Sequence, residues 1–131
     1  MDLPSVQARD LMSNRFDAWI DAYFLESIPE EFDAYTDKTV CLIQEWLSEP
    51  IRYANASFKG WEIGVEVQIF YKPDADVDSI DAEMSVAQLF YQNGWIIEQS
   101  KNHVKDPDTG QVTKTFYFSK KLMIGSELNG N

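Results

Sequence analysis

Apolar and polar residues alternate along residues 61–71, and this alternation is the clearest structural pattern in the chain. A period of two predicts an antiparallel strand with one face in the core and the other in water. Phe70 interrupts the polar face, which places it either under a loop or in a contact surface. The apolar face consists of Trp61, Ile63, Val65, Val67, Ile69 and Tyr71.

Two further strands are predicted around the segment Asp106-Pro107-Asp108-Thr109-Gly110. Pro107 favours the first central position of a type I turn and Gly110 the left-handed closing position, so a four-residue loop should pair Asp106 with Gln111. The resulting core-facing side carries Trp95, Ile97, Phe116, Phe118 and Leu122. The opposite side carries Glu98, Ser100, Asn102, Thr113, Thr115, Tyr117 and Ser119.

The outer part of this hairpin is polar on both faces, because Lys101, His103, Lys105 and Lys114 lie near the turn. We expect the hairpin to project beyond the sheet as an arm that meets a partner, with an ordinary solvated hairpin as the alternative. Lys120 has the parity of the core side, which predicts either a bulge near Ser119 or an edge position where its amine reaches water.

Two helices are predicted. The first begins at Pro4 or Ser5, and we favour an end near Asn14, although the apolar spacing would let it continue to Leu25. The second is capped by Asp78 or Ser79 and ended by Gly94. The apolar residues of the first are Ala8, Leu11 and Met12, and those of the second are Ile80, Met84, Ala87, Phe90 and Tyr91.

Between the helices, residues 22–25 are predicted to form a short buried strand and residues 39–46 a central strand. Residues 29–38 form an acidic loop. Residues 47–60 contain Pro50, Asn55, Ser57 and Gly60 and are predicted to be a connecting loop with at most a short edge pairing.

The element order predicts an α+β fold, with a mainly antiparallel sheet, two helices packed on one face and a projecting C-terminal β-hairpin. We expect one domain over residues 1–124 and a fraying tail over 125–131. The expected core consists of Val40, Leu42, Trp61, Ile63, Val65, Val67, Ile69, Met84, Phe90, Trp95, Ile97, Phe116 and Phe118.

The net charge of the 131 residues is −11, which opposes binding to phosphate backbones and argues against a sequence-specific reader of nucleic acid. The charge is uneven: residues 1–94 hold six basic and 18 acidic residues, whereas residues 95–131 hold five and four. Cys41 is the only cysteine and lies in an apolar run, so we expect a buried thiol and a reducing compartment. No apolar segment approaches the ~20 residues of a membrane span, and we expect no membrane partner.

The residues that carry chemistry do not form a catalytic or metal-binding pattern. The carboxylates from Asp74 to Glu83 resemble a calcium loop, but Ser79 and Ser85 stand where such a loop needs a glycine and a bidentate glutamate. His103 is the only histidine, and no nucleophile or phosphate-binding motif is present. We therefore predict a protein that is not an enzyme, with no catalytic residue, cofactor or metal.

Surface contacts are the remaining candidate function. Phe70, together with Tyr53 and Phe58 in the predicted loop, indicates exposed aromatic groups of the kind that mark interfaces. The candidate interface residues are Phe70, Lys101, His103, Lys105, Asp106, Asp108 and Lys114.

Residues 57–71, Ser-Phe-Lys-Gly-Trp-Glu-Ile-Gly-Val-Glu-Val-Gln-Ile-Phe-Tyr, and the hairpin over residues 99–118 resemble a small tail-protein family of long-tailed (siphovirus) bacteriophages and prophages of Gram-positive bacteria, similar to tail terminators. The resemblance covers most of residues 39–124. It implies a virion structural protein, assembled in the host cytoplasm and found at the head-proximal end of the tail. Such proteins form rings, usually hexamers, that stop growth of the tail tube and dock the head, with the tail tube protein and the head completion or connector protein as partners.

The residues alone also allow a second class of protein. An acidic adaptor or inhibitor of phage or prophage origin, acting as a monomer or dimer and mimicking DNA, would show the same composition. The oligomeric state separates the two hypotheses.

Overall fold

The computed structural model describes residues 1–30, 37–73, 75 and 80–124. The predicted cap residues Asp78 and Ser79, the C-terminal tail and most of the acidic loop lie outside these ranges. The elements are α1 (Pro4–Met12), β1 (Ala22–Leu25), β2 (Val40–Ala54), β3 (Ser57–Phe70), α2 (Asp81–Gln92), β4 (Ile96–Ser100), β5 (Val104–Lys105) and β6 (Val112–Met123).

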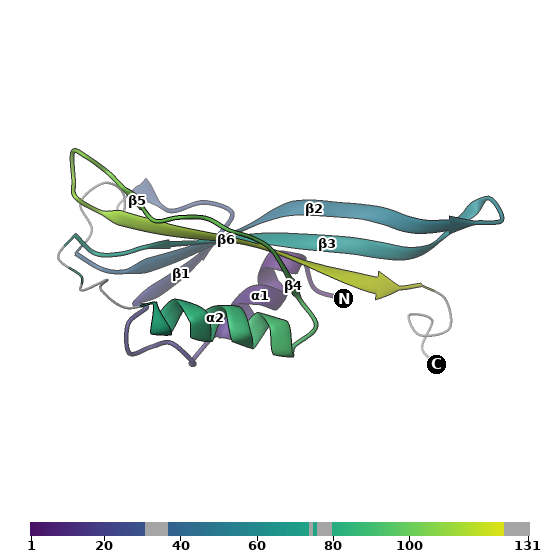
Figure 1. Ribbon diagram of the computed structural model, residues 1–131, viewed down its shortest axis with the longest axis horizontal. Helices are drawn as coiled ribbons and strands as arrows, with labels where there is room; N and C mark the ends of the chain where they lie inside the picture. Colours follow the sequence, from purple (N-terminus) through teal and green to yellow (C-terminus); the bar gives the residue numbers. More distant parts are fainter. Residues whose placement is uncertain (31–36, 74, 76–79, 125–131) are drawn as a thin grey trace.

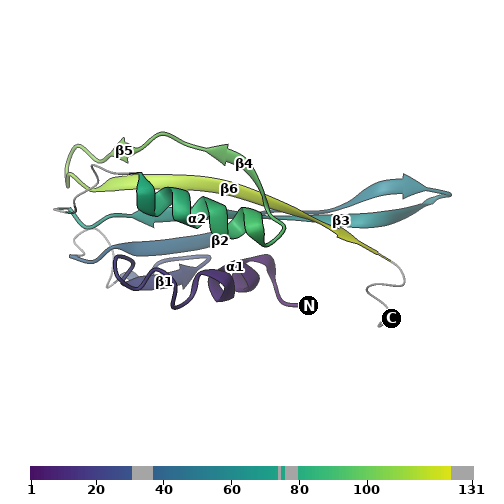
Figure 2. The same cartoon turned by 60° about the horizontal axis from the view of Figure 1, so that its bottom comes forward.

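The strands form one sheet in the order β1-β2-β3-β6-β4, with β5 paired to β6 as well. Strands β1 and β2 are parallel, and every other strand pair within the described residues is antiparallel. Both helices lie on the same face of the sheet (Figure 2). The predicted α+β fold class, with its C-terminal hairpin, is therefore confirmed.

The core lies between this face and the two helices. Val65, Val67 and Ile69 of β3 are fully buried, as the alternation predicts. Phe90 of α2 stacks on Phe118 of β6 with the ring centroids 4.1 Å apart, which joins the helix to the centre of the sheet. Cys41 is buried, as predicted, and burial raises the pKa of its thiol, so it has the character of a core residue.

Two predicted core residues are exposed instead. Met84 is 49% exposed, because the buried side of α2 is formed by Glu83, Val86 and Phe90, of which Phe90 alone belongs to the predicted stripe. Ile97 is 40% exposed. It belongs to the outermost strand β4, which shifts register between Ile97 and Gln99.

The C-terminal ends of both helices follow the predicted signals, whereas α2 begins at Asp81 with Ile80 at its N-cap position and not Asp78 or Ser79. Helix α1 stops at Met12, and Asn14 has a left-handed φ of 67°, so the end near Asn14 is confirmed. Gly94 follows α2 with φ 91°. The turn of the C-terminal hairpin is also as predicted: the Asp106 N–H donates to the Gln111 carbonyl at 2.8 Å, and Gly110 has φ 78°.

Lys120 takes the predicted edge position. Its register with Ile63 is regular, and it lies beyond Ser119, the last residue of β6 that β4 reaches. Its ammonium lies 5.6 Å from the centroid of the Trp95 ring.

The predicted loop over residues 47–60 is wrong, because β2 and β3 continue as a long hairpin through this segment. Asn55 and Ala56 form its two-residue turn with φ 51° and 63°, the left-handed pair that a type I′ turn requires. Pro50 is tolerated because β1 reaches only to Ile43, which leaves this edge of β2 unpaired among the described residues. The outer part of this hairpin has no helix over it and projects at the opposite end from the Asp106–Gly110 turn (Figure 1).

The Trp46 side chain extends from β2 across β3 near the place where the projecting part of the hairpin begins. The register of β2 against β3 shifts at Trp46, whose indole N–H reaches over Gly64 and donates to the Phe118 carbonyl at 3.1 Å. A Cβ at residue 64 would lie 2.5 Å from the Trp46 Nε1 atom, so only glycine leaves the indole room.

We predict that Gly64→Ala lowers the free energy of unfolding by about 1 to 3 kcal/mol, because the added methyl group displaces the Trp46 ring. Denaturant unfolding of Gly64→Ala, Trp46→Ala and the double variant measures the coupling. Gly64→Ala should lower the free energy of unfolding much less in the Trp46→Ala background than in the wild-type chain. An equal cost in both backgrounds would contradict the steric explanation.

Candidate functional site

The predicted interface residues do not form one surface. Lys105, Asp106 and Asp108 are exposed at the hairpin turn, whereas Phe70 is half-buried at the end of β3. Lys101 is exposed, with its ammonium 5.1 Å from the centroid of the Tyr117 ring. Asp106 has a local role as well, since its carboxylate accepts a hydrogen bond from the Asp108 N–H at 2.8 Å.

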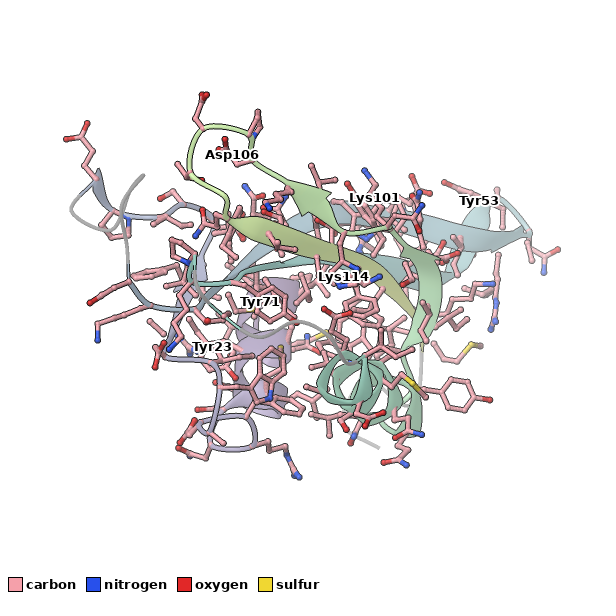
Figure 3. All side chains as sticks on the ribbon, turned by 60° about the vertical axis from the view of Figure 1, so that its left-hand side comes forward. Tyr23, Tyr53, Tyr71, Lys101, Asp106 and Lys114 are labelled. Carbon is pink, nitrogen blue, oxygen red and sulfur yellow. The ribbon has the colours of Figure 1, made fainter. Side chains whose placement is uncertain are left out.

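Lys114 is not an exposed charge of the hairpin, contrary to the sequence prediction. It pairs with the core residue Ile69 and is only 7% exposed. Figure 3 shows Lys114 on the α2 side of β6 and Lys101 on the other side. Parity places Lys114 on the helix-covered face, and the prediction failed because it took the hairpin to extend beyond the reach of α2.

The Lys114 ammonium is held by neutral groups. It donates to the Ser100 hydroxyl at 2.8 Å and to the Lys101 carbonyl at 2.5 Å, and it lies 4.9 Å from the centroid of the Phe116 ring. Among the described residues, no carboxylate lies within 4 Å of this ammonium. The charge therefore has no ion-pair partner in this part of the chain.

Glu83 is the second buried charged residue on this side, with 4% exposure. One of its carboxylate oxygens accepts a hydrogen bond from the Tyr71 hydroxyl at 2.6 Å and lies 2.7 Å from the Nε2 atom of His103. Burial and the Glu83 carboxylate raise the pKa of the Tyr71 phenol, so the phenol is the proton donor of the pair. His103, predicted as an interface residue, thus ties the hairpin to α2.

Glu83, His103 and Lys114 line a groove of about 380 Å³ between α2 and the C-terminal hairpin, which we call the α2 groove. Its walls are mainly apolar, with the Lys114 and Glu83 side chains among them. The lining residues are Ile80, Glu83, Met84, Ala87, Ile97, Ser100, Asn102, His103, Lys114 and Phe116.

A second surface lies on the projecting part of the β2–β3 hairpin, and not on the C-terminal hairpin that was predicted to project. Tyr53 is 71% exposed, and its ring is in edge contact with Phe58, which in turn contacts Trp61. We call these three residues the arm surface. At its base, Leu3 and Leu122 help to line a groove of about 420 Å³ together with Trp61. Sequence reasoning noted Tyr53 and Phe58 but assigned them to a loop.

We predict that Tyr71→Phe lowers the free energy of unfolding by about 1 to 3 kcal/mol, because it removes a donor from the buried Glu83 carboxylate. Tyr23→Phe is the matched control, since its hydroxyl donates only a long 3.4 Å bond to the Met12 carbonyl, and it should cost less than about 1 kcal/mol. Chemical denaturation measures both. Equal losses in the free energy of unfolding of the two variants would contradict a larger contribution from the hydrogen bond to Glu83.

Comparisons with known proteins give the family. A search of curated proteins found no match to the chain. None of the helices in the described ranges is long and apolar enough to cross a membrane. A family model described as "Protein of unknown function (DUF806)" matches residues 3–123, nearly the whole chain, so the protein belongs to the DUF806 family.

Proposed function

We propose that this protein is a non-enzymatic tail terminator of a long-tailed phage or prophage, which assembles into a ring on the end of the tail tube. The proposal rests on the resemblance of residues 57–71 and 99–118 to that class. These two stretches correspond to β3 with its buried apolar face and to the C-terminal hairpin with most of β6. They carry the central part of the sheet.

The observation that favours an assembly function is the arm surface. The segment from Arg52 to Lys59 is exposed throughout, yet it carries the aromatic rings of Tyr53 and Phe58. Exposed aromatic groups on a projecting element are typical of contacts between proteins, since the rings contribute large apolar area with few rotatable bonds. A projection of this kind can reach a neighbouring subunit without disturbing the core.

A ring needs two different surfaces on each subunit, because a head-to-tail contact closes only when unlike patches meet. The arm surface and the hairpin turn with Lys105 lie at opposite ends of the sheet (Figure 1). In this proposal the arm surface contacts the next subunit, and the exposed Lys101 and Lys105 contact acidic surface on the preceding one. The net charge of −11 on each subunit disfavours adhesion to DNA that passes through the ring.

We predict that the double variant Tyr53→Ser, Phe58→Ser folds normally but loses assembly with the tail tube protein, because both side chains lie outside the core. The matched control is Tyr91→Ser, which removes a ring that is 70% exposed on α2, away from the arm. Sedimentation velocity of each variant with tail tubes, and electron microscopy of tail lengths, measure the effect.

The control should form rings and give tails of normal length, and the double variant should give neither. Rings and normal tails from a well-folded double variant would contradict the proposed role of the arm surface. A wild-type protein that stays monomeric or dimeric in the presence of tail tubes would contradict ring formation itself and favour the adaptor or inhibitor class.

A further inference from the structure

Strand β4 forms an unpaired edge of the sheet. It is the last strand in the order and pairs only with β6. All five of its residues, Ile96–Ser100, are exposed, and within the described ranges its outer backbone groups bond to no other backbone. Sheet edges in proteins are usually shielded by charged residues, proline or short length, because free N–H and C=O groups invite another strand. Strand β4 is itself short and contains Glu98, but the Glu98 carboxylate is bound by the Ser119 hydroxyl, and Ile96 and Ile97 are exposed.

The α2 groove runs beside this edge. Ile97 pairs with Phe118, so its side chain lies on the helix-bearing face of the sheet, where it lines the groove opposite Met84. Ile80, Met84 and Ile97 are 56%, 49% and 40% exposed. A strand added to β4 would direct every second side chain toward this apolar surface. A single added strand can therefore occupy both the edge of β4 and the α2 groove.

The Lys114 ammonium supplies a charge for recognition at the end of β4. Its two hydrogen bonds, to the Ser100 hydroxyl and to the Lys101 carbonyl, leave one of its three N–H groups without a hydrogen bond in the described structure. Glu83, which also lines the groove, is bound by Tyr71 and His103. A cation that is 93% buried without an ion-pair partner among the described residues is unfavourable, and a carboxylate from outside would relieve this cost.

We propose that β4 and the α2 groove bind an extended peptide segment of a partner protein, which adds to the sheet as a strand. The segment places apolar side chains between Ile80, Met84 and Ile97, and a Glu or Asp carboxylate on Lys114. Backbone pairing to β4 supplies affinity, and the pockets for alternate side chains supply specificity. This binding site is independent of the arm surface and of ring formation.

The test uses the folded chain and a labelled nonapeptide, Thr-Val-Thr-Val-Thr-Glu-Thr-Val-Thr, in which the valines and the glutamate share one face. Fluorescence anisotropy gives the Kd, and amide chemical shifts locate the bound peptide. We expect the shifts to concentrate in residues 96–101 and 114. A twin with Gln in place of Glu should bind about tenfold more weakly, because it lacks the charge-assisted hydrogen bond.

Two N-methylated versions of the peptide, methylated at odd or at even residues, test the strand geometry. One set of N–H groups faces β4 and the other faces water, so one version should bind and the other should not. Equal binding of both versions would overturn strand addition.

The variant Lys114→Met keeps an unbranched stem beside Phe116 and removes the charge. It should bind the Glu and Gln peptides equally, whereas Lys121→Met, at an exposed position on the opposite face of β6 that pairs with Glu62, should keep the tenfold difference. The proposal is overturned if the wild-type protein binds both peptides equally, or if millimolar Glu peptide leaves the β4 amides unshifted. These two results need only the wild-type chain and hold even if Lys114→Met does not fold.

Discussion

The whole structure depends on the register of β3 between β2 and β6. The antiparallel pairing of β3 with β6 is continuous from Gly60 to Phe70, and its register with β2 shifts at Trp46. There the indole crosses Gly64 to reach the Phe118 carbonyl. Between this point and the Asn55-Ala56 turn, each long strand passes from a part that the helices cover, which still includes Ile63, to a part that they do not. The covered part makes the core and the α2 groove, and the uncovered part makes the arm surface.

Sequence patterns were sufficient where the structure is locally determined. The alternation over residues 61–71 identified the buried face of β3, and the chemistry of Pro107 and Gly110 identified the hairpin turn. The ends of both helices followed from Asn14 and Gly94. In each case the deciding residues lie within a few positions of the feature that they determine.

The failures concern residues whose surroundings come from distant parts of the chain. Pro50 indicates a loop unless the neighbouring strand is known to be too short to pair with it. In the sequence, Glu83 has the character of an outward-facing residue of a helix. Its partners Tyr71 and His103 lie 12 and 20 positions away, so no local pattern reveals that it is buried. Lys114 looks like a charge on a hairpin tip until the register places it opposite Ile69. The candidate site was therefore predicted only in part: His103 and Lys114 were selected as exposed groups, but Lys114 is buried and His103, although exposed, is bound to Glu83.

The central claim is that the projecting part of the β2–β3 hairpin exists to contact other subunits or tail components. Hydrogen exchange of the amides in residues 51–60, measured by mass spectrometry for the free chain and after addition of tail tubes, tests this claim most directly. These amides have no helix over them in the free chain, and we expect their exchange to slow strongly on assembly while the core amides of residues 65–69 change little. Assembled protein whose arm amides exchange as fast as in the free chain would contradict the claim.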